Sequence, residues 1–309
     1  MVTRSERLRG GVIGLLVGDA LGVPYEFHGP GDIPPRDQIE MEPPRGFRRA
    51  HAGVPVGTWS DDGAQALCLL ACLLDCDRFD PDDFGQRLVR WYKDGYLAVA
   101  GEVFDVGITS RHAISAIARG VPALDAGPCG ERDNGNGSLM RVLPLVLGHR
   151  GPDEELMRDA MLQSRVTHGH MRSQVCCALY CLWARGVWSC DADPWSGAVI
   201  RLRELWRDNR AALEELEAAI RPEASVSISG SGYVVDCLHS AHWAIEQGDY
   251  EQVVKAAISL GNDTDTTACV AGGIAGLRDG LSAIPLRWRE ALRGRDLVES
   301  LLDRLCERG

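Results

Sequence analysis

The chain has 309 residues, of which 45% are hydrophobic and only 6% are aromatic, so it can build a sizeable core mainly from aliphatic side chains. Its formal net charge of −11 and the lack of a basic block argue against broad contact with nucleic acid or with an anionic membrane. One nucleotide in a pocket remains compatible with this charge, because backbone amides can bind phosphate.

The first 22 residues contain an apolar stretch that resembles a signal peptide. Gly18 and Asp19 interrupt it, and no convincing cleavage site follows, so we expect a buried helix instead. No uncharged run reaches the ~18 residues that a membrane span needs. We therefore expect a cytoplasmic protein.

Apolar residues at spacings of three and four predict helices along most of the chain. The expected helices cover residues 63–74, 82–97, 110–120, 153–168, 173–188, 195–220, 233–248, 250–261, 266–280 and 288–309. Only residues 224–230, ASVSISG, suggest a strand, and they equally suit an extended loop. The segment 28–57 is rich in Pro and Gly and lies between two motif-bearing regions, so we interpret it as a functional loop. The prediction is one all-α domain over residues 1–309.

Eleven cysteines occur without any Cys-x-x-Cys pair. Cys68, Cys72 and Cys76 recur at every fourth residue, as do Cys177 and Cys181, which places each group on one face of a helix. This pattern favours a reduced helical core that uses cysteine as a small hydrophobic residue, with a soft-metal site as the alternative. The odd count also suits a reducing compartment.

Two acidic clusters occur where a loop meets an expected helix. GTWSDDGAQ, residues 57–65, begins one, and GNDTDTT, residues 261–267, begins the other. Their candidate oxygen ligands are Ser60, Asp61, Asp62, Asp263, Asp265 and Thr266. Simple capping needs one oxygen, whereas neighbouring carboxylates repel each other unless a cation lies between them. An all-oxygen set suits Mg²⁺, Mn²⁺ or Ca²⁺ rather than Zn²⁺ or copper, and two such clusters could hold two ions.

Seven motifs occur in the order that is typical of one protein family. They are GDALGVPYE (18–26), WSDDGAQ (59–65), FDVGITSR (104–111), NGNGSLMRVLPL (134–145), SRVTHGH (164–170), SGYVVDCL (231–238) and GNDTDTTACVAGGIAG (261–276). Together they resemble the ADP-ribosylglycohydrolases, a group that includes dinitrogenase reductase-activating glycohydrolase and the ADP-ribosylarginine and ADP-ribosylserine hydrolases. The resemblance extends nearly from end to end.

The resemblance implies an all-α fold with a site for two Mg²⁺ or Mn²⁺ ions, held by the six residues of the acidic clusters. One departure is Gly63, which stands where the family usually has Thr after the two aspartates. We expect Gly63 to alter the affinity for metal rather than to abolish binding. Asn262 stands where Gly is common, and we expect little cost from it.

The same resemblance implies a substrate in which C1 of the distal ribose of ADP-ribose is linked to a protein side chain or a small molecule. The catalytic candidates are then Glu26, Asp61 and Asp105. Glu26 opens the loop 28–57 and would be a mobile carboxylate that acts as acid or base. Asp105 either contacts the leaving group or caps the helix that follows it.

The remaining motifs supply candidates for substrate binding. Gly107, Gly135 and Gly137 permit close approach of a ligand to the backbone, and Asn136, Gly137 and Ser138 would place amides or a hydroxyl against the diphosphate. The alternative for the segment NGNGS is a plain Asn-Gly turn followed by a helix cap.

Three larger side chains have two interpretations each. Met140 packs either on the sugar or in the core. His168 matches a histidine that contacts ligand in the family, although a lone histidine is more often structural. Tyr233 either stacks on adenine or packs at the start of a helix.

The leading hypothesis is a metal-dependent hydrolase of arginine-linked ADP-ribose, with the linkage chosen by family analogy alone. A non-catalytic ADP-ribose-binding or crystallin-like structural member is the alternative, and Gly63 is the main feature in its favour. A two-metal phosphohydrolase of the helical HD type would need His-Asp ligand pairs, which this sequence lacks. The sequence specifies neither the modified target nor the oligomeric state.

Overall fold

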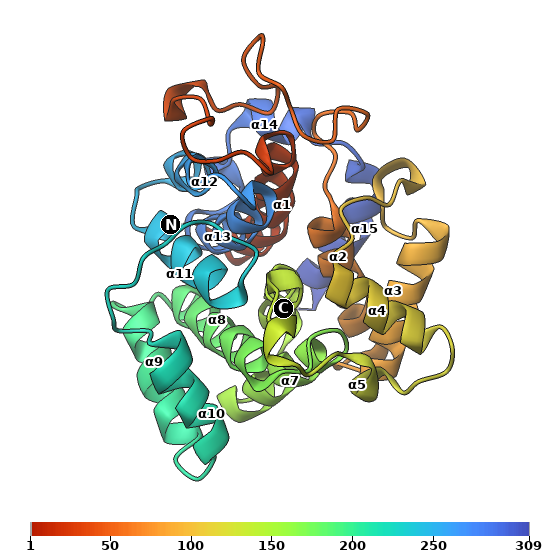
Figure 1. Cartoon of the computed structure of the whole chain (residues 1–309), viewed down its shortest axis with the longest axis vertical. Helices are drawn as coiled ribbons and strands as arrows, with labels where there is room; N and C mark the ends of the chain where they lie inside the picture. The colour runs from red at the N-terminus through yellow and green to blue at the C-terminus, as the bar shows by residue number, and fades with distance from the viewer. Residues whose placement is uncertain (1, 309) are drawn as a thin grey trace.

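The computed structural model describes residues 2–308 and confirms an all-α fold (Figure 1). Its α-helices are α1 (Arg4–Gly22), α2 (Asp61–Cys76), α3 (Pro81–Asp94), α4 (Ile108–Ile117), α5 (Ala123–Ala126), α6 (Leu143–Gly148), α7 (Asp153–Arg165), α8 (Met171–Ser189), α9 (Pro194–Leu205), α10 (Arg210–Glu214), α11 (Val234–Ile245), α12 (Tyr250–Ser259), α13 (Thr264–Asp279), α14 (Leu286–Ala291) and α15 (Arg295–Glu307). Short 3-10 helices are η1 (Val23–Tyr25), η2 (Arg36–Gln38), η3 (Val99–Gly101), η4 (Glu131–Asp133), η5 (Asn136–Ser138) and η7 (Leu281–Ala283), and η6 (Glu215–Ile220) is a π-helix.

The described part of the chain contains almost no β-structure. Residues 224–230 form an extended loop and not a strand. The one β-type contact within residues 2–308 is an isolated bridge between Gly135 and Tyr233.

Two of the predicted helices are interrupted. The helix expected over 195–220 ends at Leu205, and a new one starts after Asn209, whose side chain accepts a hydrogen bond from the N–H of Ala212. This local cap competes with continuation of the helix. The helix expected over 288–309 is divided at Gly294, which has a φ of 67°.

The centre of the molecule is the antiparallel pair α1 and α13. Glycine recurs at every fourth position of α1, at Gly10, Gly14, Gly18 and Gly22. A Cβ atom on Gly18 would lie 2.1 Å from the carbonyl oxygen of Ala268, and one on Gly22 would lie 2.3 Å from the Cα atom of Asp265. These distances are shorter than any van der Waals contact, so the two backbones approach this closely only because α1 lacks side chains there.

The other helices surround this pair. α8, α11 and α12 pack against α13, whereas α2, α6 and α15 pack against α1 (Figure 1). Figure 1 shows α3, α4 and α5 grouped on one side of the molecule and α9 and α10 on another. The last turn of α1 and the first turns of α2 and α13 therefore converge on one region.

Most of the predicted cysteine stripes lie in the core, but Cys76, at the end of α2, is partly exposed. Cys68, Cys72, Cys177 and Cys181 are buried free thiols. Burial raises the pKa of Cys68 to about 12, so this thiol stays protonated.

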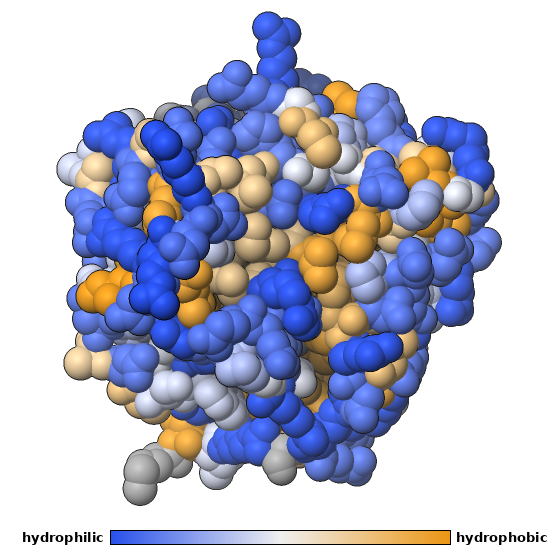
Figure 2. All heavy atoms as spheres, turned by 90° about the horizontal axis from the view of Figure 1, so that it is seen from below, coloured by the Kyte–Doolittle hydropathy of each residue, from blue (hydrophilic) through white to orange (hydrophobic). Residues whose placement is uncertain are grey.

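The segment 28–57 contains only η2 as regular structure and crosses the end of the molecule near α12 and α14 (Figure 1). Glu40 anchors it there through Arg287 at 2.9 Å and Lys255 at 3.2 Å. On the face shown in Figure 2, hydrophilic residues surround small separate groups of apolar ones. Within residues 2–308, no helix combines the length and the apolarity that crossing a membrane requires.

Candidate active site

The first acidic cluster forms the N-terminus of α2. Ser60 is its N-cap, and the Ser60 hydroxyl accepts a hydrogen bond from the N–H of Asp62 at 3.2 Å. Asp19, a buried residue of α1, accepts hydrogen bonds from the N–H groups of Ser60 at 3.0 Å and Gly63 at 2.8 Å. Because Ser60 and Asp19 cap the helix, the carboxylates of Asp61 and Asp62 have no capping role.

The second acidic cluster forms the N-terminus of α13 and supplies Asp263, Asp265 and Thr266. Just before it, Asn262 has a φ of 61°, a left-handed conformation that asparagine tolerates. The Asn262 carbonyl accepts a hydrogen bond from the N–H of Phe27 at 2.8 Å, and its N–H donates to the His28 carbonyl at 2.6 Å. These contacts tie the segment that follows Glu26 to the start of α13.

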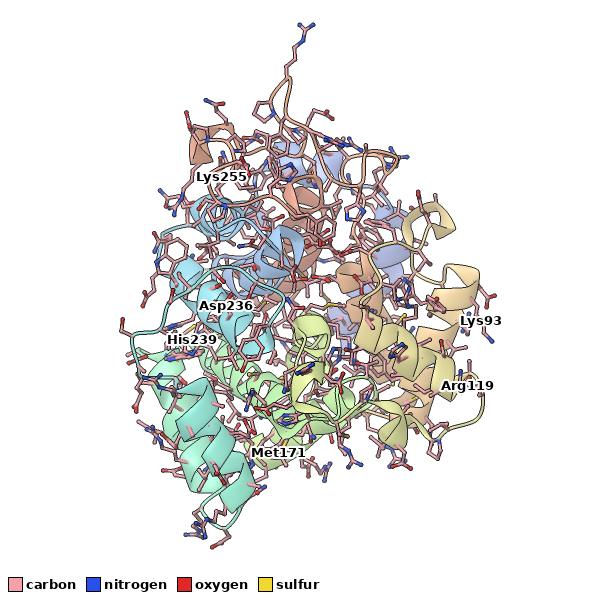
Figure 3. All side chains as sticks on the ribbon, viewed as in Figure 1. Lys93, Arg119, Met171, Asp236, His239 and Lys255 are labelled. Carbon is pink, nitrogen blue, oxygen red and sulfur yellow. The ribbon has the colours of Figure 1, made fainter. Side chains whose placement is uncertain are left out.

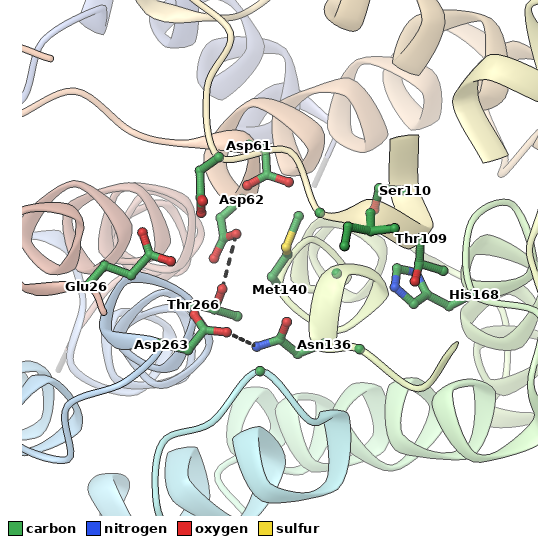
Figure 4. Close-up of a pocket in the computed structure, with 16 residues that line it drawn as sticks. Glu26, Asp61, Asp62, Thr109, Ser110, Asn136, Met140, His168, Asp263 and Thr266 are labelled. Atoms are coloured by element: carbon green, nitrogen blue, oxygen red, sulfur yellow. Dashed lines mark hydrogen bonds between the residues drawn. The ribbon is translucent and has the colours of Figure 1, made fainter. Parts of the chain in front are cut away.

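The two clusters face each other across a cavity of about 250 Å³ (Figure 4). The Thr266 hydroxyl donates to Oδ1 of Asp62 at 3.4 Å, which joins α13 to α2. Carboxylate oxygens of Glu26, Asp263 and Asp265 lie within 4.8 Å of one another. Acidic residues that are remote in the sequence thus share one site.

Some carboxylate oxygens of this group lack the partners that buried charges need. Oδ2 of Asp62 and Oδ2 of Asp265 are buried and have no hydrogen-bond partner. Burial, followed by the charges of neighbouring carboxylates, raises the pKa of Asp61, Asp62 and Asp265 well above the usual range. Buried carboxylates need either protons or a cation. Because all the donor atoms are oxygens, the residues fit hard divalent cations such as Mg²⁺ or Mn²⁺.

Glu26 borders the cavity and contacts a histidine of the loop 28–57. Its Oε2 lies 2.7 Å from Nε2 of His51, and Oδ1 of Asp105 lies 3.9 Å from the same nitrogen. Burial and then the charge of Asp105 raise the pKa of Glu26 to about 10. Burial and then the charge of Asp263 raise the pKa of Asp105 to about 7. Both carboxyl groups therefore hold protons more readily than they would in water, which suits a proton-transfer role.

The other side of the cavity is lined by Gly135, Asn136, Gly137, Met140 and His168 (Figure 4). The Asn136 amide donates to Oδ2 of Asp263 at 3.0 Å. A Cβ atom on Gly137 would lie 2.9 Å from Cε1 of His168, so the glycine leaves the imidazole open to the cavity. Burial and then the charge of Arg141 lower the pKa of His168 to about 3, which keeps the ring neutral.

The structure brings most of the predicted residues to the cavity wall. Those that line it are Glu26, Asp61, Asp62, Asp105, Gly107, Asn136, Gly137, Met140, His168, Asp263 and Thr266. Ser60 and Asp265 are buried directly behind this wall.

Two predicted binding residues lie elsewhere. Ser138 has no exposed surface, and its hydroxyl accepts a hydrogen bond from Ser164 at 2.9 Å, so it faces the core. Tyr233 is 40% exposed, and its hydroxyl accepts a hydrogen bond from Arg172 at 3.2 Å. Its neighbour Gly232 lines the cavity, so Tyr233 stands next to the opening and not within it.

The loop that carries Gly232 is held by an aspartate on α11. Asp236, labelled in Figure 3, accepts hydrogen bonds from the N–H groups of Ser229 at 2.9 Å and Ser231 at 2.6 Å. This contact fixes the extended segment against the helix that follows it.

Gly63 does not face the cavity. A Cβ atom there would lie 2.7 Å from Cδ2 of Leu16 and 2.8 Å from Cγ of Trp59. The departure from the family motif therefore concerns packing between α1 and α2, and a threonine would require Trp59 to move.

Sequence reasoning missed several residues around the site. Asp19 could have been predicted, because a carboxylate within an apolar helix needs a hydrogen-bond donor or a positive charge beside it. His51 had no comparable signal, because it is one histidine in an irregular loop. Thr109 and Ser110, in the first turn of α4, also line the cavity and became visible only when the helices were placed in space.

Comparisons with known proteins agree with this architecture. A family model described as ADP-ribosylglycohydrolase matches residues 1–309. ADP-ribosylarginine hydrolase Tri1 of Pseudomonas putida (strain GB-1) is 29% identical over 322 residues, which cover 98% of this chain and 78% of that protein. The protein of the same name from Serratia proteamaculans (strain 568) is 30% identical over 316 residues, with 99% and 81% covered. A solved structure described as an ADP-ribosylglycohydrolase-related protein complex is 33% identical with a TM-score of 0.75, and the match covers 100% of this chain and 99% of that one.

Proposed function

This chain belongs to the ADP-ribosylglycohydrolase family, and we propose that it is a metal-dependent hydrolase that releases ADP-ribose from modified arginine side chains. The observation that carries the proposal is the pair of buried, unpartnered oxygens of Asp62 and Asp265, which come from two different helices; Asp62 lines the cavity and Asp265 is buried behind its wall. The choice of arginine rests on the two relatives named ADP-ribosylarginine hydrolase.

Two Mg²⁺ or Mn²⁺ ions would be held by Ser60, Asp61, Asp62, Asp263, Asp265 and Thr266. When bound, such ions supply positive charge that orients ribose hydroxyls and water and stabilises developing negative charge. They would also neutralise carboxylates that otherwise need protons to remain buried.

Hydrolysis breaks the bond between C1 of the ribose and a guanidine nitrogen, and water supplies the hydroxyl that C1 gains. The departing nitrogen takes up one proton in the process. Glu26 would carry this proton, because its carboxyl group borders the cavity and lies 2.7 Å from Nε2 of His51. Asp105, 3.9 Å from the histidine that contacts Glu26, would pair with the departing guanidinium group.

The rest of the cavity would hold the ADP-ribose. Met140 would pack on the sugar, and the backbone at Gly107 and Gly137 leaves room for the ligand. Asn136 and neutral His168 would donate hydrogen bonds to phosphate oxygens. Tyr233 stands where it could contact an adenine that extends out of the opening.

The decisive experiment measures release of free ADP-ribose from an ADP-ribosylated arginine peptide with Mn²⁺ or Mg²⁺, and with a chelator. We expect release only with metal, and none from the Asp62→Asn variant at equal protein concentration. Release that persists in the chelator would refute metal dependence. Release only from serine-linked or small-molecule ADP-ribosides would contradict the arginine assignment, and binding of ADP-ribose without hydrolysis of any linkage would favour the non-catalytic alternative.

A further inference from the structure

A buried arginine lies directly behind the cavity and has no part in the mechanism described above. Arg141 has no exposed surface, and its side-chain hydrogen bonds go to uncharged oxygens of Gln65, Gln163 and Thr167. Burying a guanidinium group without a paired carboxylate destabilises the folded state, so we expect Arg141 to have a role that offsets this cost. Its contacts lead to both sides of the cavity.

The first path leads to a predicted metal ligand. Nη1 of Arg141 donates to Oε1 of Gln65 at 2.6 Å, and Nε2 of Gln65 donates to Oδ2 of Asp61 at 3.0 Å. Because a guanidinium group only donates hydrogen bonds, it fixes which end of the Gln65 amide points toward it. The NH₂ group of Gln65 must then face Asp61.

The second path leads to the imidazole in the cavity wall. Nη2 of Arg141 donates to the hydroxyl oxygen of Thr167 at 2.7 Å, and this oxygen lies 2.8 Å from Nδ1 of His168. The hydroxyl has one hydrogen and Nδ1 lies close enough to accept it, so we take Thr167 as the donor in this contact. A neutral imidazole that accepts at Nδ1 carries its hydrogen on Nε2.

The Nε2 atom of His168 has space beside it. A Cβ atom on Gly135 would lie 3.4 Å from this nitrogen, so the glycine leaves the approach to the N–H group open. Gln163, the third partner of Arg141, donates to the Ser138 carbonyl at 3.0 Å and holds the same segment of chain. Two of the contacts of Arg141 thus lead to residues that line the cavity, Asp61 and His168, and the third leads to the segment that carries Asn136 and Gly137.

We propose that Arg141 is a positioning residue that sets the hydrogen-bond direction on both sides of the cavity, presenting a donor to Asp61 through Gln65 and holding His168 as the Nε2–H tautomer through Thr167. The Nε2–H group then donates to an anionic oxygen of the ligand, such as that of a phosphate. The proposal rests on the proposed function for the roles of Asp61 and His168, and it adds the residue that aligns them.

Three variants separate the two paths, and neither measurement requires hydrolysis. Nitrogen NMR of histidine-labelled protein reports the tautomer of His168, and calorimetric titration with Mn²⁺ reports metal affinity. Gln65→Met should weaken Mn²⁺ binding by about 10-fold and leave the tautomer unchanged, since loss of a residue that orients a metal ligand typically has this effect. Thr167→Val should change the tautomer population and leave Mn²⁺ affinity unchanged. Arg141→Lys should do both.

Arg87→Lys is the matched control. Arg87 is also buried, but it pairs with Asp83 at 2.5 Å and Asp75 at 2.8 Å away from the cavity. Its replacement should lower thermal stability and change neither readout. The proposal is overturned if Arg141→Lys behaves like Arg87→Lys, or if wild-type His168 carries its hydrogen on Nδ1. If Arg141→Lys fails to fold, the proposal stands only if Gln65→Met and Thr167→Val each change their own readout alone. Wild-type protein that binds no Mn²⁺ would contradict the proposed function, whereas the tautomer would still test Arg141.

Discussion

Replacing Gly18 by alanine tests how closely α1 and α13 must approach. The added Cβ atom would lie 2.1 Å from the carbonyl oxygen of Ala268, an atom of the α13 backbone that cannot rotate away. The helices would have to separate, and forcing atoms into a packed core costs about 1–3 kcal/mol, here about 3 kcal/mol because the contacted atom belongs to a backbone that cannot rotate away. Alanine is favoured over glycine within a helix by about 1 kcal/mol, which offsets part of this. We expect a net loss of about 2 kcal/mol in the free energy of unfolding.

Gly11 provides a matched control in the same helix. A Cβ atom there would lie 3.4 Å from Cδ1 of Leu147, an ordinary contact with a side chain. Gly11→Ala should therefore keep the gain in helix propensity and raise the free energy of unfolding by up to about 1 kcal/mol. The two variants differ only in the position of one methyl group, and we expect their stabilities to differ by about 3 kcal/mol.

Urea-induced unfolding followed by circular dichroism measures this difference in stability. Titration with Mn²⁺ measures whether the same substitutions change the metal affinity of the site. Gly18→Ala should also weaken Mn²⁺ binding, because α1 sets the separation of the two acidic clusters, whereas Gly11→Ala should not. Equal stability of the two variants would refute the inference that the glycine stripe sets the distance between the helices. Equal Mn²⁺ affinity would refute its connection with the site.

Three further predictions concern the carboxylates. Asp263→Asn should remove most Mn²⁺ binding and turnover. The thermal stability of the metal-free protein should stay equal or rise, because one of several mutually repelling charges is lost, and a large drop in that stability would contradict the metal-ligand role. For the metal-free protein, the raised pKa values of Asp61, Asp62 and Asp265 mean that the folded state holds protons that the unfolded chain releases above about pH 4. The contribution of these three carboxyl groups to stability should therefore fall as pH rises from that value, and Mn²⁺ should raise the melting temperature more at about pH 8 than at about pH 5. Equal shifts at the two pH values in scanning calorimetry would show that protons do not compete with metal. Glu26→Gln should lower kcat by about 100-fold or more with little change in affinity for free ADP-ribose, and equal losses in both would make Glu26 a binding residue.

The helical fold was largely predictable, because apolar residues at helical spacing are a local signal that tertiary packing then uses. Errors occurred where a side chain or glycine ends a helix within an otherwise helical pattern, as Asn209 and Gly294 do, and the short helices α5 and α6 were not predicted. The close packing of α1 on α13 was not predicted, although the glycine spacing in α1 is visible in the sequence. Spacing on one helix does not identify the helix that packs against it.

The candidate site was predictable where one short motif carries several of its residues. Asp61 and Asp62, like Asn136 and Gly137, lie next to each other in the chain and reach the cavity together. The direction of a side chain was harder to predict: Ser138 belongs to the same motif as Asn136, yet it faces the core. Residues that act across the fold were missed, because their partners are remote in the sequence.

The position of both acidic clusters depends on one helix. Ser60 caps α2 from the adjoining loop and fixes only the local backbone, whereas Asp19 caps the same helix from α1 and so fixes where α2 begins relative to α1. The glycine stripe fixes α13 against the same helix, and Gly22 meets Asp265 at its end. The contact of 3.4 Å between Thr266 and Asp62 therefore follows from two packing arrangements that share α1. Because metal–ligand distances tolerate errors of only about 0.2 Å, the proposed metal site, assembled from two remote segments, would need such a common reference, and α1 would provide it without contributing a ligand itself.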